Sequence, residues 1–217
     1  MKKEAAEPRL LEPGTYEEVF RDGAAVLLTV RARWPRLSED SPGLKRVGRY
    51  YEELAQRWKR RWAGPLLTEA KAAAGPETPP WEARLDFQVT YFENGFLSLY
   101  LDVTEDVGAP RPRRLRMGDV WALPDGTPLT LRQFFPEERW WRGKVMEQVR
   151  RQTGARIQGG ESIFCEDWPR LVSRHFSPQR FYLTAEGPAV FYPMETIAPA
   201  LEGFPTFVLE TSSFPAK

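Results

Sequence analysis

Residues 85–103 read LDFQVTYFENGFLSLYLDV, and this stretch decides the fold class. Apolar and polar side chains alternate on both sides of Asn94-Gly95, a dipeptide typical of tight turns between strands. Alternation over this length predicts two β-strands, each with one buried face. The stretch therefore predicts a β-hairpin, and with it a sheet that is largely antiparallel.

The length of the hairpin turn decides which residues lie opposite each other. A two-residue loop would put the apolar sets of the two strands on opposite faces of the sheet. A three-residue loop at 93–95, with Gly95 left-handed in a bulge, pairs Tyr91 with Leu97 and keeps both sets on one face. We expect the three-residue loop, which also gives these pairs: Val89 with Leu99 and Phe87 with Leu101.

Upstream of the hairpin, the sequence predicts one strand and one amphipathic helix. Residues 24–34 alternate as a half-buried strand does. From Ser41, a good helix cap followed by Pro42, apolar residues recur every three or four positions. This stripe comprises Leu44, Val47, Tyr51, Leu54, Ala55, Trp58 and Trp62. We expect the helix to break near Gly64-Pro65 and an exposed connector to follow at 73–80.

Downstream of the hairpin, the sequence predicts short strands and two helices. They are a strand at 115–123 after an arginine- and proline-rich loop at 109–114, a helix after Pro136, a shorter helix at 167–176, and strands at 180–184, 189–192 and 206–209. Most of these segments are too short to form a core alone, so we expect the strands to share sheets and pack on the helices.

Composition sets limits on the class of protein. The chain has 217 residues, 41% of them hydrophobic, and a net charge of +1, so the whole molecule has no attraction to phosphate or anionic lipid. Its single cysteine excludes an internal disulfide, and no apolar run is long enough to span a membrane. The first eight residues, MKKEAAEP, lack the apolar run of a signal peptide, so as written the chain is expected to be cytoplasmic.

Sequence patterns for catalysis and metal binding are scarce. Cys165 and His175 lie ten positions apart, which is no known ligand spacing, and we expect Cys165 to be a small buried hydrophobe and His175 a partly exposed residue at a helix end. Neighbouring carboxylates at 17–18, 137–138 and 166–167 keep a cell-wall glycan hydrolase or transferase as an alternative. The leading expectation is no metal, no cofactor and no enzymatic activity.

Two basic clusters, at 57–61 and 111–116, have aromatic residues nearby, as single-stranded nucleic-acid binders do. Trp58 and Trp62 fall on the apolar stripe of the predicted helix and are expected in the core, which leaves the arginines as a solvated face. Nucleic-acid binding is therefore kept only as a further alternative.

The C-terminal part carries a dispersed pattern of aromatic, glycine and proline residues. Its members are Phe181-Tyr182-Leu183-Thr184, Glu186-Gly187, Phe191-Tyr192, Ile197-Ala198-Pro199, Gly203 and Phe207, preceded by Gly126-Thr127-Pro128-Leu129-Thr130-Leu131. This pattern resembles the C-terminal domain of RsiV-type anti-sigma factors, the lysozyme-sensing family, whose domain also occurs in peptidoglycan deacetylases. The resemblance covers about 83–210, and the strand and helix before it resemble the companion N-terminal domain.

The resemblance implies an α+β fold, an α/β sandwich in which a curved, mostly antiparallel sheet packs against helices in two small, closely packed subdomains. It implies a strand–helix subdomain at 15–75, an RsiV C-terminal-like domain at 81–212, and an extracytoplasmic setting reached through an export signal absent from this sequence. Its members bind lysozyme or belong to cell-wall enzymes, so a lysozyme-like protein or a cell-wall component is the expected partner.

The expected binding residues lie where this sequence departs from the family. Where family members carry a Gly-Gly-Ala-His-like stretch, this chain has Asp106-Val107-Gly108-Ala109-Pro110-Arg111. We expect the binding site at this loop, with these residues: Val107, Gly108, Arg111, Arg113 and Arg114.

Overall fold

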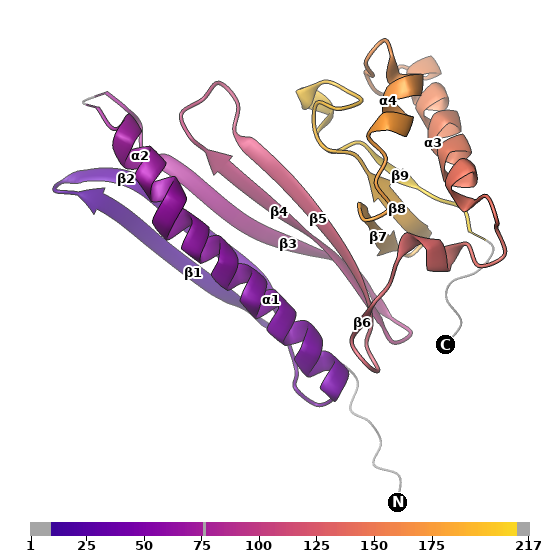
Figure 1. Ribbon diagram of the computed structural model, residues 1–217, viewed down its shortest axis with the longest axis horizontal. Coiled ribbons are helices and arrows are strands. Elements are labelled where there is room, and N and C mark those ends of the chain that lie inside the picture. The colour runs from indigo at the N-terminus through magenta and orange to yellow at the C-terminus, as the bar shows by residue number, and fades with distance from the viewer. Residues whose placement is uncertain (1–9, 76, 212–217) are drawn as a thin grey trace, which may run out of the picture. The chain divides into compact units, whose positions relative to one another are not determined.

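The computed structural model describes residues 10–75 and 77–211 (Figure 1). A six-stranded sheet has the order β1-β2-β3-β4-β5-β6, and a three-stranded sheet has the order β7-β8-β9. The elements are, in chain order, β1 (Leu10–Asp22), β2 (Ala25–Leu37), α1 (Pro42–Arg61), η1 (Trp62–Leu66), α2 (Leu67–Ala73), β3 (Trp81–Glu93), β4 (Phe96–Asp106), β5 (Arg113–Ala122), β6 (Thr127–Pro128), η2 (Leu131–Phe134), α3 (Trp141–Gln158), α4 (Trp168–Arg174), β7 (Phe181–Thr184), β8 (Gly187–Phe191), η3 (Ala200–Glu202) and β9 (Thr206–Val208). Sheets with helices segregated in this way make an α+β fold, which confirms the expected class.

Contacts divide the chain into two compact units. Among the described residues, the first unit holds 10–88, 101–115 and 122–127, and the second holds 89–100, 116–121 and 128–211. Strands β3, β4 and β5 contribute residues to both units, so neither unit is one continuous segment. The domain division at 15–75 and 81–212 follows the chain rather than the contacts and stays a prediction.

Strand β2 confirms the strand predicted from the alternation at 24–34. Leu28, Val30 and Ala32 are buried, whereas Arg31 and Arg33 between them are exposed. Strand β1, which the sequence did not predict, pairs antiparallel with β2 and lies at the edge of the sheet (Figure 1). Its side chains are mostly exposed, so it lacks the apolar alternation that marks a half-buried strand.

Strands β2 and β3 pair in parallel, which the sequence did not predict either. The register places Leu28 beside Trp81 and Ala32 beside Leu85, so the buried residues of both strands share one face. A parallel pair needs a long crossover, and α1, η1 and α2 provide it.

Helix α1 begins where the sequence predicted. The Ser41 side chain accepts a hydrogen bond from the Leu44 N–H at 3.2 Å, and Pro42 occupies the first turn. The expected stripe is buried except for Trp58, which is half-buried and packs against the fully buried Trp62 with ring centroids 5.9 Å apart.

The expected break near Gly64-Pro65 is wrong. The chain makes one wide π-helical turn, η1, in which the Leu67 N–H reaches back to the Trp62 carbonyl, and it then continues as α2. In a regular α-helix, Pro65 would lack the N–H that bonds Arg61 and its ring would press on that carbonyl. The wider turn avoids this clash without ending the helix.

The hairpin turn also differs from the expected one. Strand β3 ends at Glu93 and β4 begins at Phe96, so the loop has two residues instead of three. Asn94 has φ 54° and Gly95 has φ 78°, the left-handed pair of a type I′ turn, whose twist matches that of the strands. Farther from the turn, the Thr90 hydroxyl donates to the Ser98 hydroxyl at 3.2 Å, so these side chains share a face. Three residues of β3 but only two of β4 separate this pair from the loop, so β3 carries one extra residue, and beyond it the two strands follow the register expected for the longer loop.

In the second unit, β7 and β8 pair antiparallel, and so do β8 and β9, close to the predicted ranges. The predicted helices are present as α3 and α4. The core is formed mainly by buried apolar residues from these strands, η2, α3 and the loop after β8, including Leu131, Phe134, Val145, Val149, Leu183, Val190, Tyr192, Ile197 and Phe207.

Helix α3 covers the free edge of β9 with a ladder of side chains. Positions 148, 152 and 156 on one helix face bond the backbone of alternate positions 206, 208 and 210. The bonds are Gln148 Nε2 to the Glu210 carbonyl (2.9 Å), the Glu210 N–H to Gln148 Oε1 (2.7 Å), Gln152 Nε2 to the Val208 carbonyl (2.7 Å) and Arg156 Nη2 to the Thr206 carbonyl (2.9 Å). Four helical residues rise about 6 Å and two strand residues about 6.6 Å, so the two series stay in step. We call these three residues of α3 the edge ladder.

Candidate functional site

The candidate site is the loop between β4 and β5, residues 107–112, in the first unit. Gly108 has φ 71°, and its N–H donates a hydrogen bond to Asp106 Oδ1 at 3.2 Å. A side-chain carboxylate that bonds the backbone two residues on makes a defined turn, and the left-handed conformation favours glycine. The first half of the loop is therefore set by its own sequence.

Glu105, at the end of β4 just before the loop, is a buried carboxylate with an exposed fraction of only 4%. Arg61, the last residue of α1, donates to it through Nε and Nη2, both at 2.8 Å, and Trp62 Nε1 donates at 3.2 Å. Burying a carboxylate is costly unless it is paired and hydrogen-bonded, and a two-pronged guanidinium contact is the strongest way to do so. The hydrogen bond to Glu105 in turn raises the pKa of Arg61 above its ordinary value.

Arg113, the first residue of β5, anchors the other end of the loop. Its Nη1 lies 3.2 Å from Glu69 Oε2 on α2 and 3.8 Å from Glu105 Oε2. Both ends of the loop are thus tied through ion pairs to the helical segment that spans α1, η1 and α2. We call these four residues the anchor network: Arg61, Glu69, Glu105 and Arg113.

The five expected binding residues are all near the loop, but they do not share one surface. Val107 and Gly108 line an open hollow together with Trp81 and the connector before it. Arg113 belongs to the anchor network, whereas Arg114 lies on the opposite face, because successive strand residues alternate. Arg111 is exposed on the loop.

Arg114 lines a second hollow of about 320 Å³ on the sheet face opposite the anchor network. The lining residues come from four neighbouring strands and the loop: Thr29, Arg31, Glu82, Ala83, Arg84, Thr104, Asp106, Pro112 and Arg114. Arg31 is held by Glu17 at 2.8 Å and Arg84 by Asp86 at 2.9 Å. Arg114 makes no such ion pair with the described residues, so its guanidinium is available to a ligand.

The last arginine of the basic cluster, Arg116, belongs to the second unit and stacks on two aromatic rings. Its guanidinium carbon lies 3.8 Å from the centre of the Tyr100 ring and 4.6 Å from that of Phe204. Cation–π contacts of this kind hold an arginine in place. The cluster at 111–116 therefore divides into exposed, ion-paired and ring-stacked arginines, a division that the sequence could not show.

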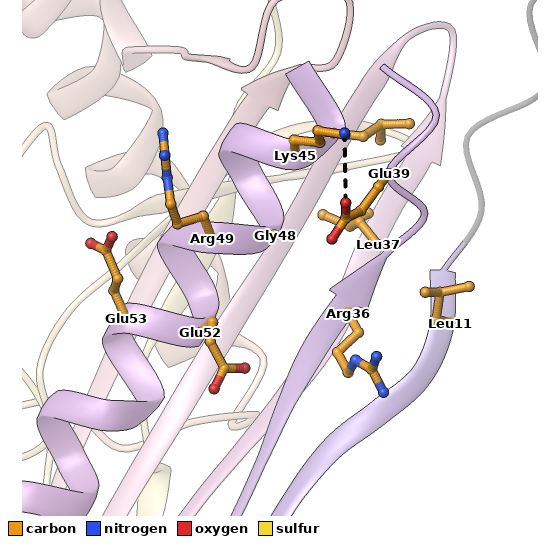
Figure 2. Close-up of a pocket in the computed structure, with 10 residues that line it drawn as sticks. Leu11, Arg36, Leu37, Glu39, Lys45, Gly48, Arg49, Glu52 and Glu53 are labelled. Atoms are coloured by element: carbon orange, nitrogen blue, oxygen red, sulfur yellow. Dashed lines mark ion pairs between the residues drawn. The ribbon is translucent and has the colours of Figure 1, made fainter. Parts of the chain in front are cut away.

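A further hollow, of about 380 Å³, lies beside the first half of α1 and was not expected from the sequence (Figure 2). Gly48 lines this hollow on the side of the helix, and nothing lies within 4 Å of the position that a Cβ at Gly48 would take. The charges around it are mixed: Lys45 pairs with Glu39 at 3.7 Å, and Glu52 accepts from Trp34 Nε1 at 2.7 Å. Figure 2 shows Arg49 and Glu53 projecting from a different side of the helix than Glu52, so the charged groups do not converge on one point.

No catalytic arrangement joins Cys165 and His175. Within the described part of the chain, both residues make only backbone hydrogen bonds, and neither bonds the other. The expectation that Cys165 is buried is wrong: it is half-buried, because it lies in the irregular segment before α4. His175 is partly exposed at the end of α4, as expected. The described residues also contain no group of three or more His, Cys, Asp or Glu side chains placed to hold a metal ion.

The basic face of α1 is partly engaged in contacts within the protein. Lys59 Nζ lies 4.5 Å from the ring centres of both Tyr16 and Trp34, and Arg61 binds Glu105. Two of the five residues at 57–61 are thus cations that already contact groups within the protein, which reduces the positive charge that this face offers to a phosphate backbone.

No helix in the described residues is long and apolar enough to cross a membrane.

No protein-family model and no curated protein matches the chain. Among the solved structures similar to it are two DUF3298 family proteins. One is from Pseudomonas aeruginosa PAO1, with a TM-score of 0.61 and 14% identity over 93% of this chain and 89% of that one. The other is from Bacteroides fragilis NCTC 9343, with a TM-score of 0.60 and 11% identity over 94% of this chain and 89% of that one. At these identities the likeness shows a common fold, and the chain has the fold of DUF3298 family proteins.

Proposed function

We propose that the chain is a non-catalytic binding module of the RsiV-like type, and that its β4–β5 loop contacts a partner that presents carboxylates. The observation that carries the proposal is the anchor network, which holds both ends of the loop, while Arg111 on the loop and Arg114 at the start of β5 are exposed. Only Glu105 of this network is buried, and ion pairs with exposed partners contribute little net stability, so the value of the network here is the position that it gives the loop.

Anchoring matters because association has to overcome the entropy of ordering a loop. With Glu105 and Arg113 fixed, only the six residues 107–112 remain to be ordered, and Gly108 is already held by Asp106. A partner therefore meets a loop close to its bound conformation, which raises affinity without any additional contact.

Exposed guanidinium groups set the chemistry of the partner. Arginine binds a carboxylate through two parallel hydrogen bonds, and this geometry makes it selective for planar anions. A retaining glycosidase such as lysozyme carries two carboxylates about 5 Å apart in its cleft. Peptidoglycan peptides also carry carboxylates, so a lysozyme-like protein or a cell-wall component suits the loop.

The test is calorimetric titration of the chain with lysozyme and, separately, with soluble peptidoglycan fragments. Binding of one of them to the unmodified chain is expected. The double variant Arg111→Glu, Arg114→Glu should weaken that binding at least about tenfold, because each reversal replaces an attraction by a repulsion. Arg57→Glu, the same change on the exposed face of α1, is the control and should leave affinity unchanged.

A third variant tests the anchor network. Glu105→Gln keeps the shape of the side chain but removes its charge, so it should loosen the loop and weaken binding while circular dichroism still reports a folded chain. Absence of binding to both probes, or equal affinities for the double variant and the unmodified chain, would refute the proposed function.

A further inference from the structure

The edge of β1 differs from the edge of β9 in how the described residues cover it. Among the described residues, no side chain outside β1 hydrogen-bonds the backbone of this strand. Apart from the backbone pairing with β2 on its inner side, β1 is reached by side chains that contact its own side chains, namely Lys59 over the Tyr16 ring and Arg31 on Glu17. An uncovered edge presents a row of backbone donors and acceptors to another strand.

The proline and the bulge, two features that hinder strand addition, lie in the first residues of β1. Pro13 lies there, in an irregularity between Leu11 and Gly14 that bulges the strand. A second irregularity follows Phe20, but its extra residue is on β2, so β1 itself stays regular. Residues 15–22 therefore form a regular edge without proline.

Oppositely charged side chains lie at equal distances on either side of Val19 in this segment. Val19 is 41% exposed, and Glu17 and Arg21, two positions to either side of it, are also exposed. In an antiparallel pair, residues directly opposite interact most strongly, and opposite charges there are favourable. If Val19 of two copies face each other, Glu17 of each copy lies opposite Arg21 of the other.

We propose that β1 is the interface of a symmetric dimer, in which residues 15–22 of two copies pair antiparallel about Val19. Other registers of the same segment are less favourable: centring the pair on Glu17 or on Glu18 opposes identical carboxylates, and centring it on Phe20 places Glu18 opposite Asp22. The register about Val19 brings no like charges together. The occupant of the edge is therefore a second copy of this chain, and the two sheets join into one.

Sedimentation velocity on the full chain tests the proposal. The unmodified chain should sediment as a dimer at micromolar concentrations. Arg21→Glu opposes Glu17 at both symmetric positions and should weaken the dimer at least about tenfold, since like charges directly opposite are destabilising. Arg36→Glu is the matched control, an exposed β2 residue outside the paired segment, and should leave the dimer intact.

A rescue variant separates charge pairing from a general loss of structure. Glu17→Lys in the Arg21→Glu background restores opposite charges and should restore the dimer, while circular dichroism checks that each variant is folded. The surface contact between Arg31 and Glu17 that this change removes contributes little to folding. A monomeric unmodified chain, an unaffected Arg21→Glu dimer, or a rescue variant that stays monomeric would each overturn the proposal. None of these outcomes depends on the β4–β5 loop.

Discussion

Two sheet edges in this fold, β9 and β1, differ in how their backbone hydrogen-bonding groups are covered. A helix runs along β9 and its edge ladder bonds the backbone at alternate positions, whereas β1 has only a proline, a bulge and surface charges. The difference shows that an edge can be closed by distant residues or moderated by local ones. Only the second kind of protection leaves room for another strand.

The largest effect is expected where the closed edge is opened, at Gln148. This side chain is 2% exposed and makes two bonds to the Glu210 backbone. Gln148→Ala leaves a donor and an acceptor unpaired and should lower the free energy of unfolding by about 3 kcal/mol, measured by urea titration. Glu147→Ala, on the exposed neighbour, should change it by less than about 0.5 kcal/mol. A loss below about 1 kcal/mol for Gln148→Ala would mean that the ladder does not stabilise the edge.

The next effect concerns how the open edge is attached to the sheet. A Cβ at Gly14 would lie 2.2 Å from Cε2 of the buried Trp34, so Gly14→Ala forces the indole or the strand to move. We expect a loss of about 2 kcal/mol in the urea-derived free energy of unfolding. Gly48→Ala is the control with the opposite sign: it fills open space within α1 and should stabilise by up to about 1 kcal/mol.

A smaller effect is expected at the middle of the edge ladder. Gln152 donates to the Val208 carbonyl, but the bond is exposed, so water can replace the side chain. Gln152→Ala should therefore cost only about 0.5 to 1 kcal/mol in the same urea assay. If it costs as much as Gln148→Ala, burial is not what distinguishes the two positions.

The smallest effect is a pH dependence at the open edge. Burial, followed by a hydrogen bond to Glu18 and the charge of that carboxylate, raises the pKa of Tyr16 to about 12. A pKa raised on folding stabilises the protonated, folded state, so this contribution is complete below about pH 10 and is lost as the pH rises to about 12. Tyr16→Phe should show a shallower decline in urea midpoint than the unmodified chain over this range. Parallel declines for the two proteins would contradict the assignment.

Helix α1 and strand β2 could be predicted from the sequence because their apolar spacing and the Ser41 cap are local signals. Strand β1 could not, because its order comes from pairing with β2 rather than from its own exposed side chains. The parallel pairing of β2 with β3 was missed for a similar reason, since it depends on where a crossover of more than thirty residues returns the chain.

The candidate site shows the same limit. The arginines near the loop are visible in the sequence. The pairing of Glu105 with Arg61 is not, because the two residues are 44 positions apart and no local pattern connects them. The different environments of Arg113 and Arg114 follow from strand alternation, which could have been applied once the start of β5 was known.

The wide turn at η1 has a geometric consequence for the anchor network. Arg61 and Glu69 are eight positions apart, and in an uninterrupted α-helix they would diverge by about 80° around the axis. A π turn takes up one extra residue, so they are related as if seven positions apart, within about 20° of the same direction. The π turn therefore brings Arg61 and Glu69 to nearly the same side of one continuous helical segment. From that side the segment binds both ends of the loop, through Arg61 on Glu105 and through Glu69 on Arg113.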